Sequence, residues 1–386
     1  MRFNNGGWLA IDGIDKFHPV EIYDVKQDGN VIEICAFFKF IKTKGDLLAG
    51  PIFSYAISSP LPDVLKVELV HYKYAKNLGP KFELHTQDAS QPISLEKSDK
   101  TYIVRSGNMR LEITDVNGLE MKFFRGEEFL TKTTPNSTSY IVSKEDEFLN
   151  EKLDKRYMME QLYLSVGELV YGLGEHFTPF VKNGQTVDMW NEDGGTCSSQ
   201  GYKNIPFYIT NRNYGVFVNH TEKVSFEVAS ELVSKVQFSV PGERIEYYVI
   251  GGDSMRDVLS NYTTITGKPA LPPNWSFGLW LSSSFITDYD EKTVMSFVDG
   301  MLDRGIPLQV FHFDCYWMKG FEWCSFEWDP KVFPDPKGMI ERIHAKGLKV
   351  CVWINPYLGE RAPTFKEAAE NGYLLKKQEI NHSYPH

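Results

Sequence analysis

The sequence predicts a multidomain β plus α/β protein, in which a β-sandwich precedes the first units of a parallel βα structure. Before Pro269 short segments alternate apolar and polar residues, which is typical of antiparallel strands with one buried face. After Pro273 near-continuous apolar runs alternate with helical patterns, which is typical of a parallel sheet covered by helices. The length of 386 residues accommodates two or three domains.

The first region is predicted to be antiparallel β structure. Met109–Thr114 and Leu119–Phe123 alternate strictly, and Asn117-Gly118 between them supplies the positive φ angles of a tight hairpin turn. Ser225–Val228 and Lys235–Val240 have similar patterns. Long amphipathic patterns are scarce there, so we expect a β-sandwich.

We expect three segments along the chain. They are a β-sandwich domain over residues 1–250, a linker over 251–271 and an incomplete barrel domain over 272–386. A short helix around Ser254–Thr264 could bridge the first two segments.

The second region is predicted to contain three βα units. The expected strands are Trp275–Ser284, Leu308–Trp317 and Lys349–Tyr357, and the expected helices are Tyr289–Arg304, Pro336–Lys346 and Thr364–Asn371. Val294, Phe297, Val298 and Met301 are expected on one face of the first helix.

Each predicted parallel strand has polar and aromatic residues at its carboxyl end. These are Ser282–Phe285, Asp314–Trp317 and Asn355–Tyr357. A TIM barrel has its active site at that end, and a doubly wound sheet shares the polarity. No glycine-rich turn follows the first strand, which weakens a nucleotide-binding interpretation.

Asp314 is the most informative residue, because a carboxylate that ends an apolar strand is costly unless it is paired or faces a polar ligand. The structural alternative is that it caps the following loop or pairs with Lys319. Trp353 could be a platform for a sugar ring or a core tryptophan. The polar loop Trp190–Gly195 could reach a neighbouring site or be an ordinary turn. Asp193 and Asp314 could form a pair of carboxylates for glycoside hydrolysis.

Composition restricts the partners. The net charge of −10, with basic and acidic residues interspersed, argues against nucleic acid, and no apolar run is long enough for a membrane. The five cysteines are odd in number and include no Cys-x-x-Cys pair, so we expect the cytoplasm rather than a disulfide framework. No metal site and no cofactor is expected.

Six segments, in unbroken chain order, carry a family resemblance. They are Val170–Glu175, Trp190–Gly195, Lys203–Phe207, Leu271–Trp280, His312–Trp317 and Trp353–Pro356. They resemble glycoside hydrolase family 31, and within it the bacterial α-xylosidase group, from the first residues to about Lys377.

The resemblance implies a galactose-mutarotase-like β-sandwich followed by the first three βα units of a (β/α)8 TIM barrel. It implies a retaining double displacement that releases α-linked xylose from the non-reducing end of xyloglucan-type oligosaccharides. In the family, the aspartate that matches Asp314 binds sugar hydroxyls in the −1 subsite. Trp353 and Phe285 match residues that line this subsite, and Asp193 matches the sandwich loop that reaches into it.

Cys315 and Tyr316 match the position where α-glucosidases of the family place a smaller aliphatic pattern with Ile. In the α-xylosidase group, a cysteine and a ring crowd the site near C5 and exclude the glucose hydroxymethyl group. Phe is common at the position of Tyr316, so the match is close but not identical. An α-glucosidase is therefore the alternative within the enzymes.

The resemblance implies that no catalytic residue lies within the chain. The family's nucleophile aspartate ends the fourth barrel strand in a Lys-x-Asp-type motif, and the acid/base aspartate follows later, both beyond the chain end. Residues 378–386 depart from the family's continuation, which suggests an out-of-frame tail before an early stop. The alternative function is thus a non-catalytic carbohydrate-binding or pseudogene fragment, and a full-length form could be a homo-oligomer.

Overall fold

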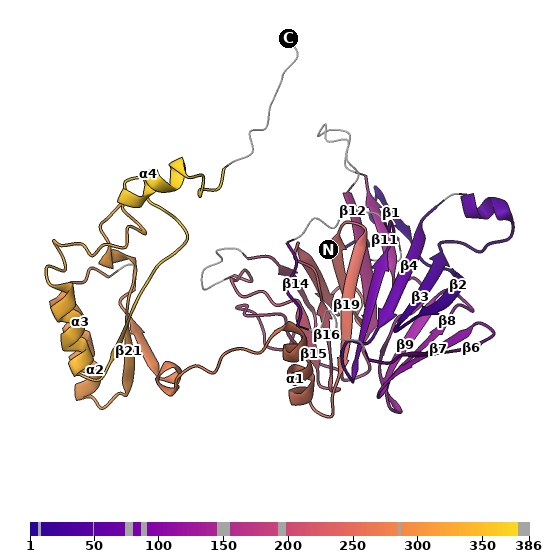
Figure 1. The fold of residues 1–386 in the computed structure, drawn as a ribbon, viewed down its shortest axis with the longest axis horizontal. Helices are drawn as coiled ribbons and strands as arrows, with labels where there is room; N and C mark the ends of the chain where they lie inside the picture. The colour runs from indigo at the N-terminus through magenta and orange to yellow at the C-terminus, as the bar shows by residue number, and fades with distance from the viewer. Residues whose placement is uncertain are drawn as a thin grey trace, which may run out of the picture. The chain divides into compact units, whose positions relative to one another are not determined.

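The computed structural model describes residues 1–6, 9–48, 50–73, 80–85, 91–144, 155–191, 198–284 and 287–376. The chain forms two compact units, Met1–Pro269 and Ala270–His386. The first is almost entirely β, and the second alternates strands with helices, which confirms the predicted fold class (Figure 1).

The first unit contains three antiparallel sheets. The six-stranded sheet has the order β1 (Ile14–Phe17), β11 (Ser139–Ser143), β12 (Lys155–Tyr163), β18 (Lys235–Pro241), β17 (Val224–Val228) and β14 (Gln185–Met189). The eight-stranded sheet has the order β13 (Val170–Gly172), β15 (Phe207–Thr210), β16 (Tyr214–Val218), β19 (Arg244–Gly251), β5 (Val64–Val70), β4 (Ile52–Ser58), β3 (Val31–Phe37) and β2 (Glu21–Asp28). The five-stranded sheet has the order β10 (Glu128–Lys132), β9 (Glu120–Arg125), β8 (Met109–Thr114), β7 (Thr101–Ser106) and β6 (Ser94–Ser98), and a 3-10 helix covers Lys44–Leu48.

One continuous hydrophobic core joins these sheets, because alternate residues of each strand point into it. Phe238 of the six-stranded sheet contacts Tyr247 of the eight-stranded sheet edge to face, with ring centroids 5.3 Å apart. Tyr208 and Phe226 form a second such contact at 6.3 Å. Each buried ring of this kind contributes about 1.5–3 kcal/mol to stability.

The hairpin predicted around Gly118 forms, but its turn is longer than predicted. Thr114 pairs with Glu120, so residues 115–119 form the connection rather than the Asn117-Gly118 dipeptide alone. Only Gly118 of that dipeptide has a positive φ, at 101°. The longer loop forms because Asp115 is buried and accepts a hydrogen bond from the backbone of Ile22 at 3.0 Å.

Helix α1 (Met255–Thr266) lies within the stretch predicted as a linker. Ser254 caps its first turn by accepting from the Asp257 N–H. The ring of Tyr262 stacks on Phe207 of β15 with centroids 4.0 Å apart. The helix therefore packs on the eight-stranded sheet as part of the first unit.

The second unit is built on a parallel sheet of three strands, in the order β20 (Leu279–Ser282), β21 (Leu308–Phe313) and β22 (Lys349–Val352). The helices are α2 (Glu291–Asp303), α3 (Pro336–Ala345) and α4 (Pro363–Glu370), with short 3-10 helices at Asn274–Phe277 and Cys315–Trp317. Phe311 and Phe313 of β21 are fully buried in a core that includes Val294 and Val298 of α2.

All three parallel strands are shorter than predicted. The aromatic residues at 275–277 and 315–317 look like strand residues, but they lie in 3-10 helices that flank β20 and β21. Phe297 was predicted on the apolar face of α2, and it is 38% exposed.

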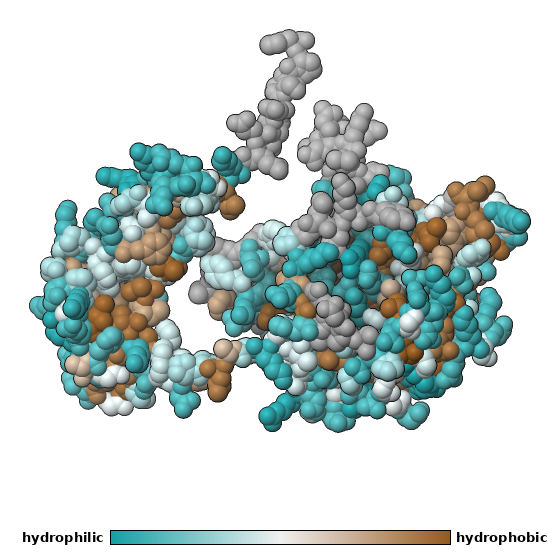
Figure 2. All heavy atoms as spheres, in the orientation of Figure 1, coloured by the Kyte–Doolittle hydropathy of each residue, from teal (hydrophilic) through white to brown (hydrophobic). Residues whose placement is uncertain are grey.

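Apolar side chains are visible on the surface of the second unit (Figure 2). Phe277, Leu279 and Trp280 are among those exposed around β20. In the described parts of the chain, no helix is long and apolar enough to cross a membrane.

Glu160 of β12 is a carboxyl group buried in the core of the first unit. Its oxygens accept hydrogen bonds from the Thr138 hydroxyl at 2.9 Å and the Gln161 N–H at 3.0 Å. Burial nevertheless raises the pKa of Glu160 to about 7, because the ionised form loses its hydration.

We predict that Glu160 makes the first unit less stable as the pH rises. Its pKa is raised above the unfolded value of about 4.3, so its stabilising contribution is complete below pH 4.3 and is lost as the pH rises to about 7. The steepest part of that loss is about 1.4 kcal/mol per pH unit. Urea denaturation followed by far-ultraviolet circular dichroism should show this slope in the wild type and not in Glu160→Gln. Identical pH dependence in both proteins would contradict the prediction.

Candidate functional site at the strand ends

The parallel register of the second unit brings three strand ends to one edge of the sheet. Ser282 pairs with His312, and Phe313 pairs with Val352. The residues that follow, Ser283, Asp314 and Trp353, therefore lie next to one another across the sheet. This is the edge where the sequence analysis placed the site.

Side chains from the preceding unit hold both backbone groups of Asp314. The Asp314 N–H donates to the Ser283 Oγ at 3.0 Å, and the Tyr289 hydroxyl donates to the Asp314 carbonyl. Ser283 and Tyr289 are both buried, so these bonds are shielded from water. The Asp314 backbone is consequently fixed at the end of β21.

The Asp314 carboxylate caps the 3-10 helix that follows it, as the structural alternative predicted. Its Oδ1 accepts from the Cys315 N–H at 2.6 Å. The predicted alternative partner, Lys319, instead forms ion pairs with Glu322 and Glu327 at 3.4 and 3.7 Å. Asp314 is half-buried, so capping leaves part of the carboxyl group accessible to a ligand.

Cys315 and Tyr316 follow Asp314 and differ in exposure. Burial and a hydrogen bond to the Asp314 carboxylate raise the pKa of the Cys315 thiol to about 11, so this thiol is neutral near pH 7. The Tyr316 side chain is 43% exposed, and its ring meets Trp323 edge to face at 5.7 Å. Together they form a wall of one small group and one ring.

Trp353 is fixed through its backbone. Its N–H donates to the Phe313 carbonyl, and its carbonyl accepts from the indole N–H of Trp317, both at 2.8 Å. Its side chain is half-buried and packs partly on the core of the second unit. The residue therefore has both a core contact and an accessible surface.

Several positioning residues were not predicted. Ser283 and Tyr289 hold Asp314, and the Cys324 thiol donates to the Asn355 carbonyl at 2.9 Å. The run of three serines at the end of β20 was the sequence signal for Ser283. Tyr289 had no such signal, because it lies outside every strand-end motif.

His312 contributes a neutral group beside Asp314. Its Nδ1 lies 2.8 Å from the Ser282 hydroxyl. Burial lowers the pKa of His312, although the Asp314 charge opposes this shift. The described edge thus has one carboxylate surrounded by neutral hydroxyl, thiol, imidazole and aromatic groups, which suits a neutral polyhydroxylated ligand.

Two of the predicted site residues, Asp193 and Phe285, lie outside the described residues. Within the described ranges, no group of three or more His, Cys, Asp or Glu side chains is placed to hold a metal ion.

Comparison with known families assigns both units. Residues 54–227 match the glycosyl hydrolase 31 N-terminal galactose mutarotase-like domain. Residues 269–385 match the glycosyl hydrolases family 31 TIM-barrel domain.

Full-length sequence relatives include two α-xylosidases. Alpha-xylosidase XylQ of Lactiplantibacillus pentosus is 46% identical over 98% of this chain and 48% of its own length. An alpha-xylosidase of Emericella nidulans is 43% identical over 98% of this chain and 50% of its own length. An alpha-glucosidase of Saccharolobus solfataricus is 33% identical over 50% of this chain. The chain spans about half the length of the curated relatives it matches over 98% of its residues.

Solved structures share the fold. The Flavobacterium johnsoniae GH31 dextranase FjDex31A, complexed with glucose, matches 96% of this chain and 42% of its own with a TM-score of 0.74 at 20% identity. A GH31 α-xylosidase from a soil metagenome, complexed with xylose, matches 91% of this chain and 50% of its own with a TM-score of 0.65 at 16% identity. With the β-sandwich, the parallel strand ends and both domain matches in chain order, the chain belongs to glycoside hydrolase family 31.

Proposed function

We propose that this chain supplies the xylose-recognising part of a retaining α-xylosidase active site. The substrate would be α-linked xylose at the non-reducing end of xyloglucan-type oligosaccharides. The observation that carries the proposal is the wall formed by Cys315 and Tyr316 directly after Asp314. The higher identity of the two α-xylosidases over nearly the whole chain supports it.

The wall provides discrimination by size. Xylose and glucose differ by the hydroxymethyl group on C5, and a ring and a thiol at that position leave it no room. Since the Cys315 thiol is neutral, it acts as a small steric group rather than as a charged ligand. Rejecting one such group is worth about 1–3 kcal/mol. This favours the α-xylosidase over the α-glucosidase alternative.

Asp314 would bind sugar hydroxyls rather than attack the sugar. Because Ser283 and Tyr289 hold its backbone, its carboxylate needs little reorganisation to accept hydroxyl hydrogen bonds. Trp353, Phe285 and Asp193 would line the same subsite. The proposed compartment is the cytoplasm, which the free thiols of the four described cysteines support.

A second candidate function is carbohydrate binding without catalysis. The family's nucleophile is an aspartate after the third βα unit, and Asp335 is the last aspartate of the sequence. Without a nucleophile, no covalent glycosyl-enzyme can form. These 386 residues are therefore expected to recognise the sugar without cleaving it.

We predict that the purified 386-residue chain releases no p-nitrophenol from p-nitrophenyl α-xyloside, because it lacks the attacking carboxylate. A colorimetric assay over several hours is sufficient, with an active α-xylosidase as the positive control. Turnover above the buffer rate would overturn this prediction.

We predict that Tyr316→Ala relaxes sugar selectivity. Removal of the ring opens space at C5, so the ratio of xylose to glucose affinity should fall about tenfold. Isothermal titration calorimetry with each sugar measures the ratio. Tyr316→Phe is the matched control, because it keeps the ring and should keep the selectivity. Equal ratios in Tyr316→Ala and wild type would argue against the wall.

We predict that Asp314→Asn weakens xylose binding about tenfold or more, because hydrogen bonds to a charged group contribute about 1.5–3 kcal/mol each. Ser283→Ala should weaken binding less, since it loosens the backbone and leaves the carboxylate in place. Calorimetry with xylose checks both, and thermal unfolding verifies that each variant is folded. Unchanged affinity in a folded Asp314→Asn variant would remove Asp314 from the proposed subsite.

A further inference from the structure

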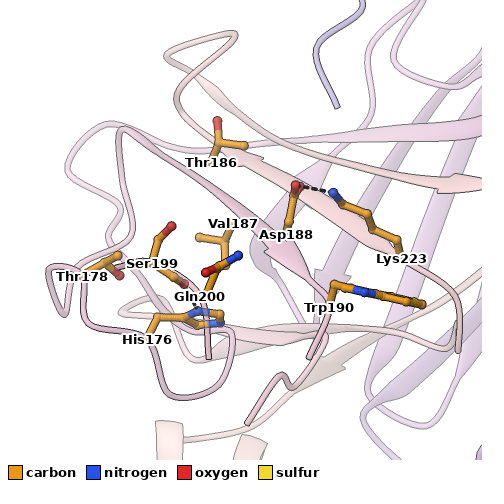
Figure 3. A pocket seen from close by; sticks show the side chains of 9 residues that line it. All are labelled: His176, Thr178, Thr186, Val187, Asp188, Trp190, Ser199, Gln200 and Lys223. Carbon is orange, nitrogen blue, oxygen red and sulfur yellow. Dashed lines mark hydrogen bonds and ion pairs between the residues drawn. The ribbon is translucent and has the colours of Figure 1, made fainter. Parts of the chain in front are cut away.

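A cavity of about 190 Å³ lies beside β14 in the first unit (Figure 3). This is about the volume of six water molecules, which suits one monosaccharide ring and is smaller than a drug-sized site. Its walls include the side chains of Asp188, Trp190, Lys223 and His176. Threonine and serine hydroxyls and the amide of Gln200 complete a mostly polar lining.

Trp190 supplies the cavity with a flat apolar surface. Its side chain is 53% exposed although it is a large aromatic residue. In Figure 3 the indole lies on the same side of the cavity as Asp188 and Lys223. An exposed ring beside polar groups offers the two contacts that a sugar ring makes, an apolar face and hydroxyl hydrogen bonds.

Asp188 supplies a carboxylate that is already oriented. It forms an ion pair with Lys223 at 2.7 Å, and its Oδ1 accepts from the Ser225 hydroxyl at 2.6 Å. Ser225 is itself buried, and its Oγ lies 3.2 Å from the buried Glu227 carboxylate. Burial raises the pKa of Asp188, but the bonds from Lys223 and Ser225 outweigh it and lower the pKa below its ordinary value. Asp188 is therefore a fixed acceptor.

The charges of the cavity favour a neutral ligand. Lys223 compensates the charge of Asp188, so neither an anion nor a cation gains from the pair as a whole. The Nδ1 of His176 lies 2.7 Å from the Ser199 carbonyl. The His176 Nε2 is buried and has no hydrogen-bond partner among the described residues. Buried polar atoms of this kind are usually satisfied by a ligand or by ordered water.

We propose that this cavity binds one pyranose unit of a neutral oligosaccharide. The sugar ring stacks on Trp190, its hydroxyls donate to Asp188, and Lys223 donates to a ring or hydroxyl oxygen. This inference goes beyond the proposed function, since it assigns a second sugar site to the β-sandwich.

The test uses cellotetraose as the probe, because this β-linked glucose tetramer carries no xylose. Isothermal titration calorimetry of the 386-residue chain should show saturable binding, and saturation-transfer NMR should show contact with the axial ring protons. Trp190→Ala should weaken binding about tenfold, because the ring contact is lost. Trp190→Phe should retain most of the affinity, since it keeps an aromatic face.

Matched controls separate this site from the strand ends. Phe177→Ala removes an equally exposed aromatic side chain that does not line the cavity, and it should leave binding unchanged. Asp314→Asn should also leave cellotetraose binding unchanged, whereas Asp188→Asn should weaken it. Thermal unfolding of each variant verifies its fold.

Three results would overturn the proposal: no saturable binding, full binding in a folded Trp190→Ala variant, or loss of binding in Asp314→Asn. Xylose binding at the strand ends is measured separately, so either site can fail without the other.

Discussion

The parallel pairing of β20 with β21 is the interaction on which the candidate site depends. That ladder places Ser282 opposite His312 and so brings Ser283 to the backbone of Asp314. Tyr289, at the start of the following helix, then reaches the Asp314 carbonyl. A carboxylate at a free strand end would sample many positions, whereas one held at both backbone groups presents a defined acceptor. Strand pairing thus sets the direction of the carboxylate before any ligand is present.

Element type could be predicted from the sequence because the apolar period changes at the boundary between the two units. Element ends could not, as the residues after Phe313 show. Cys315, Tyr316 and Trp317 extend an apolar run, yet the Asp314 side chain bonds to the next N–H and begins a 3-10 helix. That outcome is decided by one local hydrogen bond, which an apolar pattern does not encode.

The candidate site could be predicted only in part, for a similar reason. Asp314 and Trp353 have a visible signal, since each follows an apolar strand. Tyr289 has none, because its partner is 25 residues away and the contact exists only after folding. The polar face of the six-stranded sheet behaves likewise. Alternation predicts that Ser225 and Glu227 face solvent, but the segment that begins at Met1 covers them and bonds to Glu227.

The neutral thiol of Cys315 has a chemical consequence. The thiolate, not the thiol, reacts with alkylating agents and peroxides, and at a pKa of about 11 only about one molecule in ten thousand is ionised at pH 7. A cysteine in an accessible sugar site would ordinarily be a point of oxidative inactivation. Here the neighbouring carboxylate suppresses that reactivity, so the shape of the wall is protected against oxidants by the same residue that the ligand would use.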